Sequence, residues 1–243
     1  MKPKRQNQIR EGKSKILFST DSSDQIIQYF KDDATAFNAL KKGTIKNKGT
    51  INNQVSSALF QYLEKKGVNT HFLNQLSDRE MLVKKVNIIP VEVVVRNRAA
   101  GSICKRLAIE KGTVFTTPLV EYFYKSDALG DPLIAETHIF QFQWATKEEL
   151  SQMVEQSLRI NELLKSVFLD IGLELIDFKL EFGRDKQGKV ILADEFTADG
   201  CRLWDLKTQE PMDKDRFRQD LGGVDEAYFE VSQRLQNYFE ATS

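Results

Sequence analysis

The sequence has only two cysteines, Cys104 and Cys201, and two histidines, His71 and His138, among 243 residues. Two cysteines cannot build a disulfide framework, and these four residues show none of the close spacings of zinc ligands. We therefore expect neither a disulfide scaffold nor a zinc site. Neither histidine has a partner that sequence spacing identifies, so neither receives an acid–base role.

The chain also lacks an excess of either charge, because 35 Lys and Arg residues balance 35 Asp and Glu residues. Proteins that coat nucleic acids normally carry a large basic excess, so no nucleic-acid partner is expected. No apolar run approaches the roughly 20 residues of a membrane-spanning helix. The polar N-terminus has no apolar signal-peptide region. These features predict a cytoplasmic protein with no membrane partner.

Hydrophobic residues make up 41% of the chain, which is enough for an ordinary globular core. Apolar residues at helical spacing predict helices at 50–66, 102–112, 146–172 and, in two segments broken at Gly222-Gly223, 213–241. Residues typical of strands predict strands at 14–18, 25–30, 81–86 and 91–95, and a hairpin over 174–196. This order predicts an α+β protein with two lobes, 1–85 and 86–243, whose boundary lies between 85 and 125.

The predicted hairpin carries the most informative pattern. Its first strand, LELIDFKLEFG, alternates so that Asp177, Lys179 and Glu181 share one face. If Gln187-Gly188 forms a two-residue turn, Asp194 on the return strand lies directly across from Glu181, whereas a longer turn with a bulge would shift the pairing by about one residue.

Two facing carboxylates repel each other unless a cation or a proton lies between them. Oxygen ligands of this kind suit Mg²⁺, which often uses one or two carboxylates together with nucleotide phosphates. A solvated sheet face on which Lys179 neutralises its neighbours explains the same pattern equally well.

Three further segments carry basic residues beside turns. Arg202 follows the Asp199-Gly200 turn, where a guanidinium is suited to clamp a phosphate, although an ordinary surface turn with an Arg–Asp pair explains this segment more simply. Arg96 leaves an apolar strand that leads to Gly101-Ser102, and a serine at a helix N-cap would direct N–H groups at an anion.

The third segment is REGKSKILF, residues 10–18. Gly12, Lys13 and Lys15 lie between two predicted strands, and such a turn can cover nucleotide phosphates. The segment has a single glycine and does not match the phosphate-binding motif G-x-x-x-x-G-K-[ST], so a plain charged hairpin is its default interpretation.

Taken together, these segments resemble the SAICAR synthetase family, the phosphoribosylaminoimidazole-succinocarboxamide synthases, over nearly the whole chain. The matching motifs are EGKSK (11–15), DDATAFN (32–38), KGTINNQ (48–54), LVKKVNIIPVEVVVRNRAAGS (82–102), DFKLEFG (177–183), DEFTADGCRLWD (194–205) and MDKDRFRQDLGG (212–223). Their combination is highly specific, although no single motif is.

The resemblance implies a two-lobed α+β fold with a nucleotide cleft like those of ATP-grasp proteins and kinases. It also implies a reaction: ATP, L-aspartate and carboxyaminoimidazole ribonucleotide (CAIR) would give SAICAR, ADP and phosphate through an acyl phosphate. Mg²⁺ is the implied cofactor, and the family suggests a homodimer.

The resemblance further implies roles for individual residues. For ATP and its metal, the resemblance implies Glu181 and Asp194 as ligands of Mg²⁺, the segment Val83–Val86 with Lys84 at the adenine, and a group around the phosphates made of Gly12, Lys13, Lys15, Lys125 and Glu181. For the ribonucleotide, it implies Arg96, Ser102 and Arg202 at the 5′-phosphate, and Asp177 and Lys179 at the imidazole and its carboxylate. Asp199 would orient the substrate, and the 33–38 loop would bind L-aspartate. Lys13, Asp177 and Lys179 are the implied catalytic residues.

The sequence departs modestly from the family pattern. It has Ala34-Thr35 where a Thr-Ser or Ser-like pair is expected, and Cys201 where serine is usual. Ala198 replaces an expected proline, which would loosen the loop that carries Arg202. Two other functions stay open: another ATP-dependent ligase or small-molecule kinase on the same scaffold, and a catalytically inactive nucleotide-binding module. The presence of Lys13, Glu181 and Asp194 argues against the second.

Overall fold

The computed structural model describes residues 3–36 and 41–242. Its N-terminal sheet has the antiparallel order β1-β2-β3-β7-β6. These strands are β1 (Arg5–Glu11), β2 (Lys15–Thr20), β3 (Gln25–Phe30), β6 (Phe72–Gln75) and β7 (Glu80–Lys84). Helix α1 (Lys48–Lys65) contacts β3, β6 and β7, so one face of this sheet is covered. The predicted strands at 14–18, 25–30 and 81–86 are confirmed.

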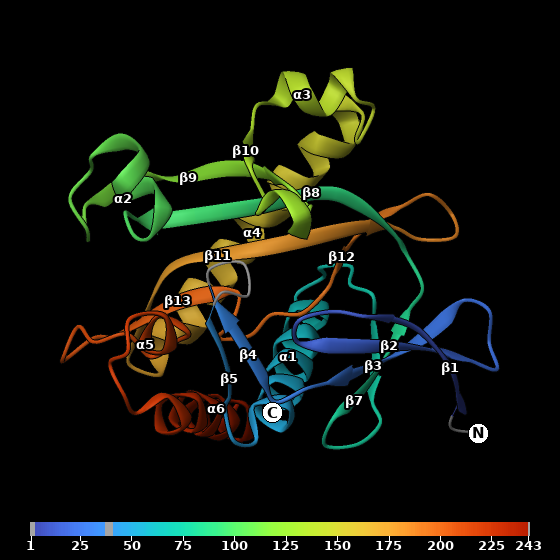
Figure 1. Cartoon of the computed structure of the whole chain (residues 1–243), viewed down its shortest axis with the longest axis horizontal. Helices are drawn as coiled ribbons and strands as arrows, with labels where there is room; N and C mark the ends of the chain where they lie inside the picture. Colours follow the sequence, from blue (N-terminus) through green and yellow to red (C-terminus); the bar gives the residue numbers. More distant parts are fainter. Residues whose placement is uncertain (1–2, 37–40, 243) are drawn as a thin grey trace.

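The second sheet has the order β10-β9-β8-β11-β12, and β13 also pairs with β11. Its strands are β8 (Asn87–Arg98), β9 (Val114–Tyr124), β10 (Leu133–Ile134), β11 (Leu173–Arg184), β12 (Val190–Ala193) and β13 (Cys201–Asp205). Strand β11 pairs with β8 along one edge, while β12 and β13 share its other edge. Figure 1 shows β11 running the length of this sheet, above the N-terminal strands.

The longest helices cover the sheets. Helix α4 (Lys147–Asp170) packs against β8 and β11, and α6 (Val224–Ala241) packs against α1. Helix α4 begins with a capping box, in which Glu149 N donates to Thr146 Oγ1 and Thr146 N donates to Glu149 Oε2. The remaining elements are β4 (Asp33–Ala36), β5 (Lys41–Thr44), α2 (Ser102–Leu107), η1 (Asp127–Leu129), α3 (Glu136–Gln141) and α5 (Asp215–Arg218).

Two predicted helix boundaries have different outcomes. The break at Gly222-Gly223 is confirmed, because it separates α5 from α6. The helix predicted over 102–112 is too long, since α2 ends at Leu107 and Ala108 takes a left-handed φ of 51°. A left-handed residue cannot continue a right-handed helix, so the chain turns toward β9 there.

One hydrophobic core runs through both sheets. It includes Phe30 and Leu59 from the N-terminal part and Val93 and Phe178 from the second sheet. The backbone also joins the two parts, because His71 N donates to Leu192 O of β12 at 2.8 Å. The chain passes from the first sheet to the second between β7 and β8. The division into two lobes at 85–125 therefore stays a prediction.

The hairpin has the longer of the two turns considered from the sequence, and its pairing is shifted by one residue as that alternative requires. Strands β11 and β12 are joined by residues 185–189 rather than by Gln187-Gly188, and Glu181 pairs with Ala193. The wider loop is held by Asp185 Oδ1, which accepts the N–H groups of Gln187 and Lys189 at 2.9 Å each. Asp194 therefore lies one residue beyond the partner of Glu181.

None of the helices in the described part of the chain is long and apolar enough to cross a membrane. Both cysteines, Cys104 and Cys201, are free thiols.

Candidate active site

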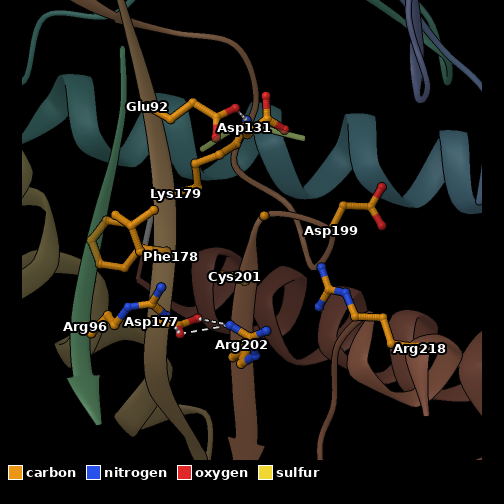
Figure 2. A pocket seen from close by; sticks show the side chains of 12 residues that line it. Glu92, Arg96, Asp131, Asp177, Phe178, Lys179, Asp199, Cys201, Arg202 and Arg218 are labelled. Atoms are coloured by element: carbon orange, nitrogen blue, oxygen red, sulfur yellow. Dashed lines mark hydrogen bonds and ion pairs between the residues drawn. The ribbon is translucent and has the colours of Figure 1, made fainter. Parts of the chain in front are cut away.

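A pocket of about 260 Å³ opens on β8, β11 and the turn that precedes β13. The lining side chains are ionic at most positions. Figure 2 shows Glu92, Asp131 and Lys179 at one end, Arg96, Asp177 and Arg202 at the other, and Asp199 and Arg218 to one side. The pocket is lined by Glu92, Val94, Arg96, Asp131, Asp177, Phe178, Lys179, Asp199, Gly200, Cys201, Arg202 and Arg218. Charged groups from strands far apart in the sequence meet here because β8 and β13 are both neighbours of β11.

Two arginines share one carboxylate at the first end of the pocket. Arg96 Nη1 lies 2.5 Å from Asp177 Oδ2, and Arg202 Nη1 lies 2.9 Å from the same oxygen. Strand register explains this contact, because Asp177 pairs with Arg96 on one side and Arg202 on the other. Asp177 and Arg96 are each 3% exposed, so their charges are stabilised by each other and not by water.

A second layer of ion pairs surrounds these arginines. Arg202 Nε lies 2.8 Å from Asp215 Oδ2, and Arg218 Nη1 lies 2.5 Å from the other oxygen of Asp215. Burial alone would lower the pKa of Arg202, but Asp177 and Asp215 outweigh burial and raise it. On the other side, Glu121 pairs with Arg96 at 2.7 Å. These contacts keep the guanidinium groups charged and fixed in orientation.

Gly101 leaves room for the guanidinium of Arg202. Its φ is +65°, and an added Cβ would lie 2.7 Å from Cζ of Arg202. Ser102 follows as the first residue of α2, so the N-cap is Gly101 and not Ser102 as predicted. Ser102 Oγ accepts a hydrogen bond from Arg106 Nη1 at 2.6 Å. The start of α2 thus brings a hydroxyl group beside the arginine end of the pocket.

Lysines and carboxylates form the second end of the site. Lys179 Nζ lies 2.8 Å from Glu92, 2.5 Å from Glu181 and 3.8 Å from Asp194. Lys125 adds a further ion pair with Glu181 at 2.7 Å. Burial lowers the pKa of Lys179, but Glu181, Asp194 and Glu92 overcome it and raise the pKa well above its usual value. A charged ammonium group therefore lies between Glu181 and Asp194.

Lys15 joins this group from the N-terminal sheet. Its Nζ lies 2.5 Å from Asp194 Oδ1 and 2.6 Å from Glu195 Oε2. Burial opposes ionisation of Asp194, but Lys15, Lys179 and Lys125 outweigh it and lower its pKa. Asp194 has a left-handed φ of 64° directly after β12 ends. That turn directs its carboxylate toward Lys15, and such backbone conformations are concentrated at functional sites.

Asp199 belongs to a third, more buried network. Its carboxylate pairs with the fully buried Lys48, accepts from Tyr228 OH at 2.7 Å and from Asn52 Nδ2 at 3.2 Å, and lies 3.7 Å from Lys214. Burial would raise the pKa of Asp199, but Lys48 and Lys214 lower it. The network fixes the turn that leads to Arg202.

The structure brings most of the predicted site residues together. Arg96, Asp177, Lys179, Asp199 and Arg202 line the same pocket. Glu181, Asp194, Lys15 and Lys125 are joined to Lys179 directly or through shared partners. The assigned roles of these residues stay predictions.

Other predicted residues lie at the margin of the site. Lys13 is 41% exposed and pairs with Asp127 at 2.6 Å. Gly12 N donates to Lys15 O at 2.8 Å, which forms the tight turn between β1 and β2. Lys84 Nζ donates to Thr70 O at 3.0 Å, and the residue is not part of the pocket lining. The segment 33–38, predicted as a loop for L-aspartate, is not a loop over residues 33–36, which form strand β4 paired with β5, and residues 37–38 lie outside the described residues.

Several residues of the site receive no role from the sequence. They are Lys48, Glu92, Glu195, Asp215 and Arg218. Lys48 begins the KGTINNQ motif, while Asp215 and Arg218 belong to MDKDRFRQDLGG. These motifs therefore contained a signal for a function, but only the fold places their side chains beside Asp199 and Arg202.

The carboxylate end fits a magnesium ion by its chemistry. Glu181 and Asp194 supply hard oxygen ligands that share Lys179 as a counter-ion. No group of three or more His, Cys, Asp or Glu side chains is arranged to hold a metal within residues 3–36 and 41–242. Mg²⁺ commonly uses only one or two protein carboxylates together with water and phosphates, so a two-carboxylate site is consistent with its requirements.

Comparison with known proteins identifies the family. A family model described as SAICAR synthetase matches residues 8–235. The phosphoribosylaminoimidazole-succinocarboxamide synthase of Magnetococcus marinus is 54% identical over 229 residues, which cover 93% of this chain and 95% of that protein. The chain belongs to the SAICAR synthetase family. The sequence-based resemblance is thereby confirmed.

Solved structures of the family agree with the fold described above. The crystal structure of the synthase from Ehrlichia chaffeensis has a TM-score of 0.93 at 49% identity, and the match covers 95% of this chain and 98% of that one. A SAICAR synthetase solved in complex with ADP has a TM-score of 0.91 at 43% identity, covering 94% and 97% of the two chains. The α+β fold class predicted from the sequence is confirmed.

Proposed function

We propose that this chain is an ATP-dependent ligase that joins L-aspartate to the carboxylate of CAIR in purine biosynthesis, with SAICAR, ADP and phosphate as products. Membership of the SAICAR synthetase family supports the reaction. The structural observation that supports the proposal is that β11 bears residues of both the arginine end and the lysine–carboxylate end of the site. Asp177 with its arginines and Glu181 with its lysines are four residues apart, about 13 Å along a strand.

A carboxylate must be activated before an amine can attack it, because oxide is a poor leaving group. Transfer of the γ-phosphoryl group of ATP to the imidazole carboxylate would give an acyl phosphate. The amine of L-aspartate then attacks the acyl carbon and phosphate leaves. These two reaction steps require a site with two ends. One end binds the phosphates of ATP and the imidazole carboxylate, and the other binds the 5′-phosphate of the ribonucleotide.

The arginine end suits the 5′-phosphate. Arg202 uses its Nε and Nη1 atoms for Asp215 and Asp177, while its Nη2 lies against Gly101. A phosphate beside Gly101 and Ser102 would accept hydrogen bonds from Nη2 and from the Ser102 hydroxyl, and Arg96 would add positive charge. Asp177 then orients both arginines.

The lysine–carboxylate end suits the reacting groups. Lys179 lines the pocket, and its ammonium group would neutralise the imidazole carboxylate as it approaches ATP. Lys15, Lys125 and Lys13 would neutralise phosphate oxygens as negative charge develops on them. Glu181 and Asp194 are the residues that would hold Mg²⁺, with the lysines as their counter-ions. When bound, Mg²⁺ screens the negative charge of the triphosphate.

Product analysis tests the proposal. The purified chain is incubated with ATP, Mg²⁺, CAIR and L-aspartate, and ADP is measured together with the mass of the nucleotide product. We expect SAICAR, and ADP formation that requires all three substrates. ADP formation that is independent of aspartate would instead indicate a kinase or another ligase, and ATP binding without any turnover would indicate an inactive nucleotide-binding module.

Three finer assignments complete the proposal. L-aspartate is the second substrate, and the segment 33–38, which includes strand β4, is its candidate site. The active form is a homodimer, which light scattering coupled to gel filtration would test by a mass twice that of the 27.9 kDa chain. The location is cytoplasmic, where ATP and the other intermediates of purine synthesis are available.

A further inference from the structure

Asp213 is a fully buried carboxylate directly behind the arginine end of the pocket, with 0% of the residue exposed. Its Oδ2 accepts the backbone N–H of Leu203 at 2.8 Å, and its Oδ1 accepts the N–H of Asp215 at 2.7 Å. Among the described residues, these backbone groups are its only hydrogen-bond donors, whereas Asp177 and Asp215 are each paired with arginines.

These two hydrogen bonds fix both partners of one ion pair. Leu203 follows Arg202 on β13, and Asp215 starts α5 and binds Arg202 Nε at 2.8 Å. A single carboxylate therefore fixes the backbone on each side of the Arg202–Asp215 contact. The same segment is tied to the Asp199 turn, because Lys214 N donates to Ala198 O at 3.2 Å.

This arrangement is unfavourable for Asp213 itself. Burial, with a further contribution from Asp215, raises the pKa of Asp213 to about 7, although the two N–H groups and Arg202 oppose the increase. The titratable and charged groups that face it are Asp215 from α5, Arg202 and Cys201 from β13, and Tyr228 from α6. A neutral serine or asparagine would avoid the cost of burying a charge, so a buried acid needs a reason other than stability.

We propose that Asp213 is a positioning residue, which holds Arg202 and Asp215 in the geometry that binds the phosphate of the ribonucleotide. The proposal rests on the phosphate role of Arg202 under the proposed function. Only the ionised carboxylate can accept both N–H groups through two charged oxygens, since protonation turns one oxygen into a donor. Phosphate affinity should therefore follow the ionisation of Asp213, while ATP binding at the other end of the site should not.

The test compares Asp213→Asn with Asp185→Asn. Asp185 is the matched control because its carboxylate also accepts two backbone N–H groups, in the exposed loop between β11 and β12. Titration calorimetry with CAIR alone, at pH 8, measures ribonucleotide affinity without requiring turnover. We expect Asp213→Asn to weaken CAIR binding about 10-fold, the effect of losing one charge-assisted hydrogen bond, and Asp185→Asn to leave it unchanged.

The pH profile separates positioning from a general structural role. In the wild type, CAIR affinity should fall as the pH decreases from 8 to 6, because Asp213 takes up a proton in this range. Asp213→Asn should retain only the shallower dependence that comes from the phosphate group, whose second pKa is about 6. Identical pH profiles for the two proteins, or equal losses of CAIR and ATP affinity in the variant, would overturn the proposal.

The wild-type profile decides the question even if the variant fails to fold. Between pH 8 and 7 the phosphate group of CAIR does not yet titrate. A CAIR affinity that stays constant over this range would therefore also overturn the positioning role of Asp213. A wild type that binds CAIR with this pH dependence but forms no SAICAR would contradict the proposed function and support the positioning role. A wild type that does not bind CAIR at all would overturn both.

Discussion

Gly101 lies directly against the guanidinium of Arg202, although the two residues are 101 positions apart in the sequence. An added Cβ at Gly101 would lie 2.7 Å from Cζ of Arg202, so the absence of a side chain here is what admits the arginine. The glycine also has a φ of +65°, which disfavours other residues. The backbone conformation and the lack of space for a side chain thus both require glycine at position 101.

Replacing Gly101 with alanine should therefore displace Arg202. We expect the KM for CAIR to rise about 10-fold or more, while the KM for ATP changes by less than about twofold, because a displacement of about 1 Å at a binding group is costly. Gly188→Ala is the control, since Gly188 has a φ of +80° but no atom within 4 Å of the added Cβ. Equal effects of the two substitutions on the KM for CAIR would assign the effect to backbone strain.

Arg202→Lys tests the geometry of the arginine itself. Arg202 binds Asp215 through Nε and Asp177 through Nη1, and a lysine ammonium cannot keep this planar arrangement. We expect the KM for CAIR to rise about 10- to 100-fold with little change in the KM for ATP. Arg234→Lys, on an arginine that pairs with Asp205 at 3.0 Å outside the pocket, should leave both constants near the wild-type values. A rise confined to the KM for ATP would contradict the phosphate assignment.

Asp194→Asn tests the carboxylate end. The substitution removes the charge that binds Lys15 and Lys179 and that would hold Mg²⁺, but it keeps the size of the side chain. We expect kcat to fall at least about 100-fold while the far-ultraviolet circular dichroism spectrum stays unchanged. Asp205→Asn, which removes an ion pair with Arg234, should retain kcat within about twofold. Near-normal turnover by Asp194→Asn would show that Asp194 is not a ligand of Mg²⁺.

The sequence predicts those parts of the site that depend on local patterns. The alternation of β11 correctly places Asp177, Lys179 and Glu181 on one face, and the Gly222-Gly223 pair correctly separates α5 from α6. Both signals extend over only a few residues, so no knowledge of the tertiary fold is needed. The phosphate-binding interpretation of Arg96 and Arg202 came from turns and from family resemblance, each of which is readable along the chain.

The parts that the sequence does not predict depend on strand neighbours. Asp177 lies between Arg96 and Arg202 because β8 and β13 flank β11, and no local pattern specifies that order. The sequence alone leaves two registers open for Asp194, and Asp185 decides between them because it organises the wider loop. Lys48 reaches Asp199 only through the packing of α1, which explains why its motif was noted without a role.

His71 gives the stability of the protein a defined pH dependence. It is 2% exposed and packs edge-on against Phe60, with ring centroids 5.4 Å apart. Burial, together with the positive charge of Lys15, lowers its pKa from 6.5 to about 3, and Asp194 opposes this only in part. The unfolded chain therefore binds a proton at His71 below pH 6.5 that the folded chain does not bind, so this group destabilises the fold as the pH decreases.

The contribution of His71 to the free energy of unfolding should change by about 1.36 kcal/mol per pH unit, which gives a loss of about 2 kcal/mol between pH 6.5 and 5. Asp213 has the opposite effect, because its raised pKa lets the folded chain bind a proton first, so the wild type alone would show little net change. The variant His71→Asn separates the contribution of His71 from that of Asp213, because only the histidine is removed. Urea unfolding at pH 7.5 and 5 should show the free energy of unfolding of the variant, relative to the wild type, increasing by about 2 kcal/mol at the lower pH. A difference that is the same at both values would show that His71 titrates normally in the fold, and would place it in contact with solvent or with a carboxylate.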